Sequence, residues 1–209
     1  SMDDLNKNKL SAVELSKVEL KKHYAIVIST NGGLWRYLIG DVIQFVSLSP
    51  SRIKIVGRTK SCINTFGEEL MIHNTDTAII SACKKFSCSV KDYTVAPLYI
   101  NDESGGHQWF IEFENKPNNP KLFMREIDEN LMKLNSDYEA KRTSNIILSF
   151  PKLVIIENNE FYLWLKENNR LGGQYKVPRL SSDRIIADRL LSIKHKFSTI
   201  TTVVTNSYN

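Results

Sequence analysis

The chain has 209 residues, and its 28 Lys and Arg against 23 Asp and Glu give a formal net charge of +5. Hydrophobic residues make up 42% of it, while glycine (9) and proline (6) are few. This composition is typical of a globular protein with a packed core, and it excludes a collagen-like, low-complexity or wholly disordered chain. One large domain or two modest ones fit this length.

No segment has the roughly 20 apolar residues of a membrane span, and the first residues lack both regions of a signal peptide. Lys and Arg are interleaved with acidic residues, and no expected helix collects them on one face, so the charge does not indicate a nucleic-acid partner. We expect a cytoplasmic protein with no membrane partner and no nucleic-acid partner.

The three cysteines, Cys62, Cys83 and Cys88, are odd in number and lie among hydrophobic or helical neighbours. We therefore expect free, buried thiols in a reducing compartment rather than a disulfide framework. The four histidines are far apart and form no metal-ligand spacing with the cysteines, so no metal site is expected.

The first part of the chain reads as β-hairpins. Asn31-Gly32-Gly33 and Ser49-Pro50-Ser51 supply turns between apolar, β-branched runs. These runs are residues 24–28, 34–37, 42–46 and 52–56. Residues 13–20 fit either a strand or a short helix, and the β-rich composition ends near Gly57.

The rest of the chain mixes helices and strands. Asn74 is placed to cap a helix whose apolar residues follow the 3.6-residue period, and Asn118-Asn119-Pro120 opens a long helix through Tyr138. The other expected elements are strands at 93–100, 108–114 and 153–156, a short helix at 161–166 and a final helix at 183–193. The sequence therefore predicts an α+β fold, with a β-hairpin segment followed by a small mixed-sheet domain with helices.

Three loop segments combine glycine with charge, namely residues 33–41, 57–69 and 172–179. In the first, an aspartate after a glycine, Gly40-Asp41, can present both carboxylate oxygens to a vicinal diol, or it can be a simple turn residue. In the last, two glycines and a proline bracket Lys176, which can place a point charge against an anion. Taken singly, each segment is more typical of a solvated loop than of a site.

Taken in order, the three segments resemble the C-terminal part of the adenylate-forming superfamily, in which a Gly-Asp, a Gly-Arg hinge and a late lysine loop follow one another. Residues 26–30 running into 33–41, and then 63–70, closely resemble bacterial members of the Gretchen Hagen auxin-responsive family of acyl acid amido synthetases. The resemblance covers roughly residues 24–191. Plant members carry a different acidic, lysine-containing stretch where this chain has Gly67-Glu68-Glu69.

The resemblance implies that residues 1–57 are the β-rich end of a large N-terminal domain. It makes residues 58–196 a mobile C-terminal domain and residues 197–209 a tail. The implied parent is an ATP-dependent ligase, which adenylates a carboxylic acid with ATP and Mg²⁺ and then forms an amide with an amine or amino acid.

The resemblance also implies roles for single residues. Asp41 would hold the ribose hydroxyls, and Arg58 would support the ribose or the hinge. Lys60 would be the hinge residue, and Lys176 would be the catalytic residue that approaches the α-phosphate and the acyl carboxylate. Arg36 lies between Trp35 and Tyr37 and is either part of the site or a cation stacked on a ring.

The family's phosphate loop and acyl pocket would lie upstream of residue 1, and Ser1 before Met2 agrees with a truncated chain. We therefore expect this chain alone to be inactive and its uncovered β edges to favour self-association. The alternative function is a non-catalytic binding or assembly domain.

Overall fold

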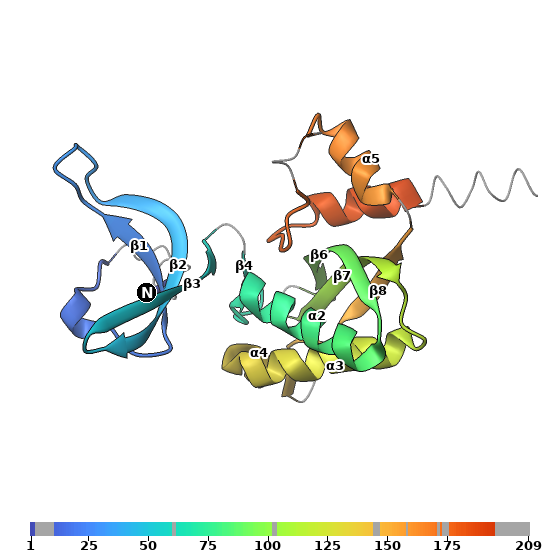
Figure 1. Ribbon diagram of the computed structural model, residues 1–209, viewed down its shortest axis with the longest axis horizontal. Helices are drawn as coiled ribbons and strands as arrows, with labels where there is room; N and C mark the ends of the chain where they lie inside the picture. Colours follow the sequence, from blue (N-terminus) through green and yellow to red (C-terminus); the bar gives the residue numbers. More distant parts are fainter. Residues whose placement is uncertain are drawn as a thin grey trace, which may run out of the picture. The chain divides into compact units, whose positions relative to one another are not determined.

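The computed structural model describes residues 1–2, 11–59, 62–101, 104–143, 147–157, 159–170, 172 and 176–194. The chain divides into two compact units (Figure 1). Unit 1 contains residues 1–62 and 71–73, and unit 2 contains residues 63–70 and 74–209.

Unit 1 is built on an antiparallel sheet in the order β1-β2-β3. Its strands are β1 (His23–Ile28), β2 (Tyr37–Leu48) and β3 (Ser51–Arg58), which confirms the predicted β-rich start. The ambiguous region before β1 contains a single turn of 3-10 helix, η1 (Leu15–Lys17). The predicted extended run at 34–37 is wrong except at Tyr37, because Gly33 (φ +96) and Arg36 (φ 48) take left-handed conformations that end strand geometry.

The sheet of unit 1 has apolar residues on both faces. Val42 and Val56 pack with Met2, Cys62 and Met71 in one cluster. Tyr24, Ile43 and Phe45 form a second cluster. The rings of Tyr24 and Phe45 meet edge to face, with centroids 5.8 Å apart.

A short two-stranded ladder follows, formed by β4 (Cys62–Ile63) and β5 (Leu70–Met71). Strands of two residues are too short to show the alternation of apolar and polar residues that predicts a strand, so the sequence did not predict them. The buried Cys62 and Cys88 and the half-buried Cys83 are all free thiols, as the odd number of cysteines predicts.

Unit 2 contains a mixed sheet in the order β6-β7-β8. The strands are β6 (Ser89–Tyr99), β7 (Gly105–Asn115) and β8 (Lys152–Ile156). β7 is antiparallel to β6 and parallel to β8. The mixed sheet and its helices confirm the predicted α+β fold.

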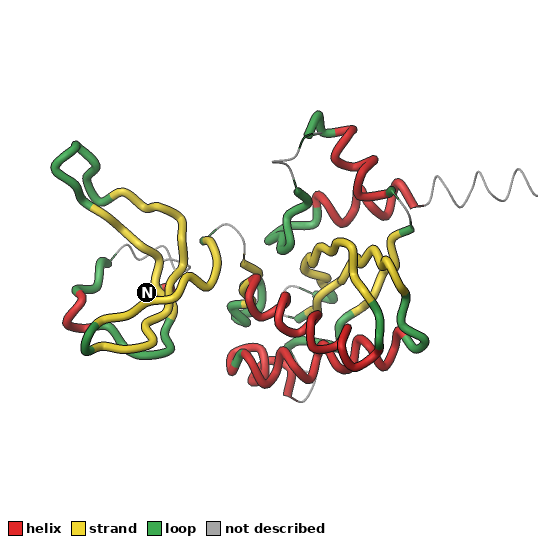
Figure 2. The backbone as a smooth tube through the Cα atoms, viewed as in Figure 1, coloured by secondary structure: helices red, strands yellow, loops and turns green. Residues whose placement is uncertain are grey.

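Helices cover both faces of this sheet (Figures 1 and 2). On one face lie α2 (Ile72–Phe86), α3 (Pro120–Leu134) and α4 (Ser136–Arg142). On the other lie α5 (Glu160–Glu167) and a helix at 185–194, whose apolar residues pack with Ala96, Phe110 and Ile156 of the sheet. Within the described part of the chain, no helix is long and apolar enough to cross a membrane.

Two helix boundaries differ from the sequence prediction. α2 begins before Asn74, whose side chain donates to the Leu134 carbonyl instead of capping the helix. The long helix predicted through Tyr138 is broken at Asn135, which has extended backbone angles and caps α4 by accepting from the Tyr138 N–H at 2.9 Å. The start of α3 agrees with the prediction, because Asn119 caps it and Pro120 occupies its first turn.

Candidate functional site

Asp41 and Arg58 are brought together by the sheet of unit 1. They are partners in the antiparallel register of β2 and β3, and Arg58 Nε lies 3.4 Å from Asp41 Oδ1. The Asp41 side chain is 27% exposed and the Arg58 side chain 75% exposed. The two residues that the resemblance assigns to the nucleotide are therefore neighbours on adjacent strands, and neither is buried.

The backbone before Asp41 is fixed by Gly40. This glycine has φ +94, in the left-handed region where a side chain is strained. Its carbonyl accepts from the Thr59 N–H at 2.8 Å and from Thr59 Oγ1 at 3.4 Å. Gly40 therefore ties the carboxylate-bearing part of β2 to the residue that follows Arg58.

The pair has the donors and acceptors that a sugar diol needs. A carboxylate accepts hydrogen bonds on both oxygens, and a guanidinium offers five N–H donors. Because Arg58 is mostly exposed, its ion pair with Asp41 is worth about 0–1 kcal/mol, so a ligand hydroxyl can compete for the carboxylate at little cost.

The remaining predicted site residues lie elsewhere. Lys60, the predicted hinge residue, falls outside the described residues. Lys176 belongs to unit 2 and is exposed. The structure thus brings together Asp41 and Arg58, while Lys176 lies on the other unit.

The segment that begins at Lys176 runs along β6. The Val95 N–H donates to the Arg179 carbonyl at 2.9 Å, and the Ser181 N–H donates to the Val95 carbonyl at 2.9 Å. Val177, next to the lysine, is 3% exposed and belongs to the core between the sheet and the last helices. Lys176 is therefore an exposed residue at the start of an anchored segment.

In the stretch Gly67-Glu68-Glu69, Gly67 is exposed and both glutamates are buried. Glu68 is fully buried, and its Oε1 lies 2.8 Å from His107 Nε2, which is also buried. Its Oε2 accepts from the Phe66 N–H at 2.7 Å. Burial alone would raise the pKa of Glu68, but the hydrogen bond and charge of His107 and the backbone donors hold it below its ordinary value. Sequence reasoning missed this pair because its members are far apart along the chain.

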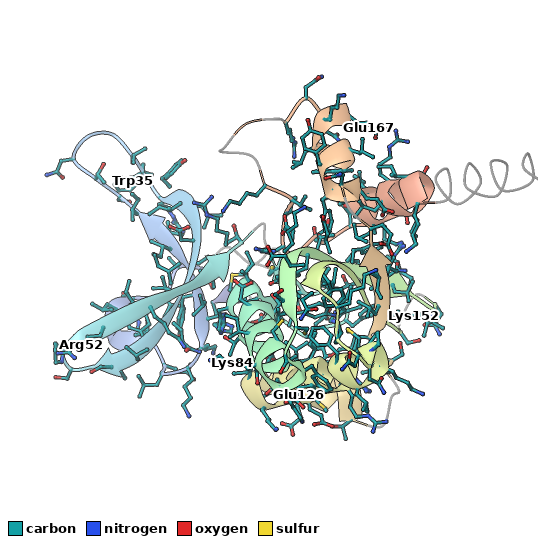
Figure 3. The ribbon with its side chains drawn as sticks, turned by 45° about the vertical axis from the view of Figure 1, so that its right-hand side comes forward. Trp35, Arg52, Lys84, Glu126, Lys152 and Glu167 are labelled. Carbon is teal, nitrogen blue, oxygen red and sulfur yellow. The ribbon has the colours of Figure 1, made fainter. Side chains whose placement is uncertain are left out.

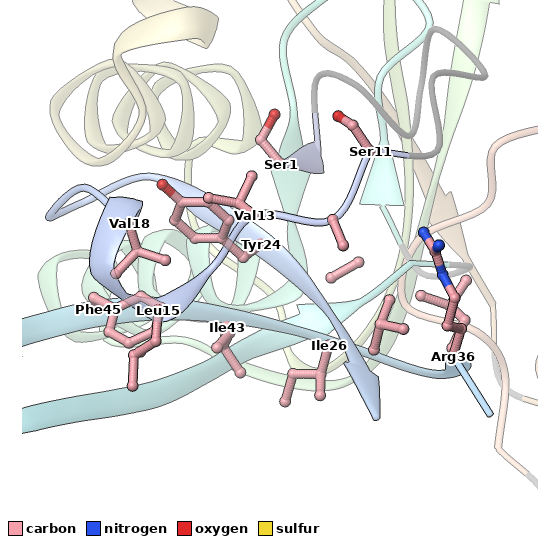
Figure 4. A pocket seen from close by; sticks show the side chains of 14 residues that line it. Ser1, Ser11, Val13, Leu15, Val18, Tyr24, Ile26, Arg36, Ile43 and Phe45 are labelled. Atoms are coloured by element: carbon pink, nitrogen blue, oxygen red, sulfur yellow. The ribbon is translucent and has the colours of Figure 1, made fainter. Parts of the chain in front are cut away.

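A cavity of about 730 Å³ lies in unit 1 (Figure 4). Arg36 lines it, and the Arg36 N–H donates to Ser29 Oγ at 3.0 Å. The remaining lining is largely apolar, so the cavity suits hydrocarbon surface rather than a phosphate. Its other residues are Ser1, Ser11, Ala12, Val13, Leu15, Val18, Tyr24, Ala25, Ile26, Val27, Leu38, Ile43 and Phe45.

Unit 1 also exposes many large apolar side chains. Trp35, in the loop between β1 and β2, is 81% exposed and projects from the ribbon (Figure 3). Ile53 and Ile55 of β3 are exposed as well, although each pairs in register with a buried residue of β2. These exposed side chains give unit 1 apolar surface outside its two buried clusters.

Comparison with known proteins gives consistent matches along the chain. Residues 73–185 match the GH3 family C-terminal domain, and residues 1–58 match the GH3 family central domain. An indole-3-acetic acid-amido synthetase of Arabidopsis thaliana, GH3.3, is 26% identical over 188 residues, which are 83% of this chain and 31% of the relative. A second, GH3.6, is 24% identical over 189 residues, which are 83% of this chain and 30% of the relative.

The solved structure of the GH3.15 acyl acid amido synthetase has the same fold, with a TM-score of 0.62 at 20% identity. The likeness covers 86% of this chain and 34% of that one. This chain thus spans about a third of the length of the relatives that it matches.

Proposed function

Because the chain belongs to the GH3 family, we propose that it forms the C-terminal part of an ATP-dependent acyl acid amido synthetase. In this proposal residues 1–57 are the end of the N-terminal domain, and residues 58–196 are the C-terminal domain that moves between the two half-reactions. Free thiols at Cys62, Cys83 and Cys88 suit a cytoplasmic enzyme, since that compartment is reducing.

The proposed reaction has two steps. A carboxylate oxygen of the acyl acid attacks the α-phosphorus of ATP, and the bond to the β-phosphate oxygen breaks to release pyrophosphate. The nitrogen of an amine or amino acid then attacks the acyl carbon. The bond to the AMP oxygen breaks, the nitrogen loses a proton, and an amide and AMP leave.

Residues of this chain would position the nucleotide and stabilise charge. Asp41 would accept hydrogen bonds from both ribose hydroxyls, and Arg58 would hold that carboxylate or donate to the sugar. Lys176 would stabilise the negative charge on the α-phosphate and the acyl carboxylate during adenylation. Lys60 would be the hinge residue between the two half-reactions.

Mg²⁺ would neutralise phosphate charge in such an enzyme. Among the described residues, no three His, Cys, Asp or Glu side chains gather into a metal site. We therefore assign no residue of this chain to the ion.

The Asp41–Arg58 pair is the observation that most supports the proposal, because an accessible carboxylate lies beside a guanidinium in the segment that matches the central domain. The test uses the whole enzyme, meaning this chain together with the portion that its relatives have in addition. Exchange of labelled pyrophosphate into ATP should require a carboxylic acid. Asp41→Asn should lower kcat/KM for ATP about 10- to 100-fold, since hydrogen bonds to charged groups contribute roughly 1.5–3 kcal/mol.

Glu19→Gln is the matched control, because Glu19 is an exposed acid of unit 1 that is paired with Lys22. It should leave exchange unchanged. Equal activity of Asp41→Asn and Glu19→Gln would contradict the assignment of Asp41. The chain alone should show no exchange with any carboxylic acid, because the proposal gives it no loop that holds the triphosphate.

The exposed apolar surface of unit 1 favours a second candidate, a non-catalytic binding or assembly domain. The two functions differ in their response to nucleotide. A pure assembly domain would show no effect of ATP or AMP on the thermal unfolding of the whole protein, and Asp41→Asn would change nothing. The amido synthetase should be stabilised by AMP in a way that depends on Asp41.

A further inference from the structure

The geometry around β6 points to a further role: we propose that Arg179 and Asp92 are positioning residues that hold Lys176 for the adenylation step. This inference rests on the proposed function, in which Lys176 acts on the α-phosphate. It adds two residues that neither the motif nor the comparisons single out.

Arg179 is fixed by two contacts to neighbouring residues of β6. Its Nη1 binds Asp92 Oδ1 at 2.5 Å, and its Cζ lies 4.4 Å from the centroid of the Tyr93 ring. Stacking on a ring fixes the plane of the guanidinium, and because its N–H donors lie in that plane, the ion pair with a carboxylate fixes its rotation within the plane. The guanidinium therefore has one orientation.

Tyr93 is itself immobilised, which makes it a rigid platform for Arg179. Its ring is stacked on Trp109 with centroids 5.8 Å apart and an interplanar angle of 19°. Its hydroxyl donates to Asp76 Oδ1. Tyr93 is 2% exposed and Trp109 is fully buried, so the platform belongs to the core of unit 2.

The backbone transmits this fixation to the lysine. Thr94 Oγ1 donates to the Pro178 carbonyl at 2.6 Å, and the Val95 N–H donates to the Arg179 carbonyl at 2.9 Å. Lys176 is separated from these anchored residues by the buried Val177 alone. The Arg179 side chain and these backbone hydrogen bonds together hold the segment next to Lys176 against β6.

The charges of the cluster are interdependent. Burial raises the pKa of Asp92, and the charge of Arg179 is the largest effect that opposes the increase, with a further contribution from Lys176. Replacing Arg179 by a neutral residue would leave a half-buried carboxylate without its main partner. The Asp92 carboxylate would then keep the Tyr93 N–H and the charge of Lys176 as the remaining groups that favour its ionised form.

The test measures both half-reactions in the whole enzyme for Arg179→Met and Asp92→Asn. Arg179→Met keeps a long side chain against Tyr93 but removes the charge. Adenylation should fall about 10- to 100-fold, the loss expected for a misplaced catalytic group. Amide formation from preformed acyl-adenylate should change less than 2-fold. The loss should appear in kcat, with little change in KM for ATP.

The decisive measurement repeats Arg179→Met in the Lys176→Ala background. A positioning residue has nothing left to position there, so adenylation should show no further loss. Arg189→Met is the matched control, because it makes the same change at a surface arginine of the same unit that is paired with Glu167. It should leave both half-reactions unchanged.

Three other results would contradict this inference. A further loss from Arg179→Met in the Lys176→Ala background, or equal losses in both half-reactions, would overturn the positioning role and leave the proposed function standing. Full adenylation by Lys176→Ala would overturn the assignment of the lysine and this inference with it. If Arg179→Met does not fold, Thr94→Val serves instead, since it removes only the hydrogen bond to Pro178 and should impair the same step.

Discussion

The buried pair of Glu68 and His107 gives a stability prediction whose size follows from its burial. Both side chains are 0–1% exposed, so water screens neither of them. His107→Ala leaves the Glu68 carboxylate buried with the backbone donor of Phe66 but without its side-chain partner. Breaking a buried pair by removing one partner costs about 3–5 kcal/mol.

We expect His107→Ala to lower the free energy of unfolding of unit 2 by about 3–5 kcal/mol. For a chain of this length each 1 kcal/mol shifts Tm by roughly 2–4 °C, so the fall should be about 6–20 °C. Glu68→Gln keeps a hydrogen-bonding group and should cost less, about 1–3 kcal/mol. Urea and thermal unfolding followed by circular dichroism measure both changes.

Lys116→Ala is the control for this prediction. Lys116 pairs with Glu157 across an exposed surface, where such pairs contribute about 0–1 kcal/mol. A cost of His107→Ala no larger than that of Lys116→Ala would refute the reasoning, because it would mean that the buried carboxylate tolerates the loss of its partner.

Three further predictions concern the pH dependence of stability, the packing at Gly105 and the self-association of the chain. The pKa of Glu68 is lower in the folded protein than its ordinary value, so the ionised carboxylate stabilises the fold at any pH above the ordinary pKa. This stabilisation is lost as the pH falls from the ordinary pKa through the lower, folded pKa. Glu68→Gln should therefore make the free energy of unfolding, measured by urea titration, depend less on pH in this acidic range. Gly105→Ala should destabilise unit 2 by about 1–3 kcal/mol in thermal unfolding, because a Cβ there would lie 2.2 Å from a backbone carbonyl oxygen and 2.3 Å from the Phe66 ring. Light scattering should show that the isolated chain self-associates, and Ile55→Lys should reduce this association more than Ile80→Lys, the equivalent change on α2. A monomer at high protein concentration would contradict this prediction.

The sequence predicted the fold class where the periodicity was strong. The apolar runs of β1 and β2 and the capped start of α3 at Asn119 each leave a local pattern, and the structure confirms them. The predicted helix boundaries were wrong where a side chain forms a hydrogen bond with a residue far away in the sequence. Asn135 ends α3 early because its amide also donates to the Glu68 carbonyl, 67 residues away.

The candidate site was likewise predictable only where its residues stand in a local sequence pattern. Gly40-Asp41 and Arg58 stand in recognisable segments, and the register of β2 and β3 places them together. Asp92 was not found, because its meeting with Arg179 depends on the path of the chain across unit 2. Long-range pairs of this kind leave no spacing in a single sequence.

The ladder between β6 and the segment after Lys176 also bears on the order in which unit 2 opens and closes. Thr94 and Pro178 are 84 residues apart, so their hydrogen bond is a non-local contact. We therefore expect the segment to join the sheet late in folding, after the chain between the two residues is largely ordered. Because Val177 and Leu180 of the lysine-bearing segment are buried in the core of unit 2, the segment should not leave β6 without exposing part of that core, so we expect Lys176 to keep its place until the core itself opens.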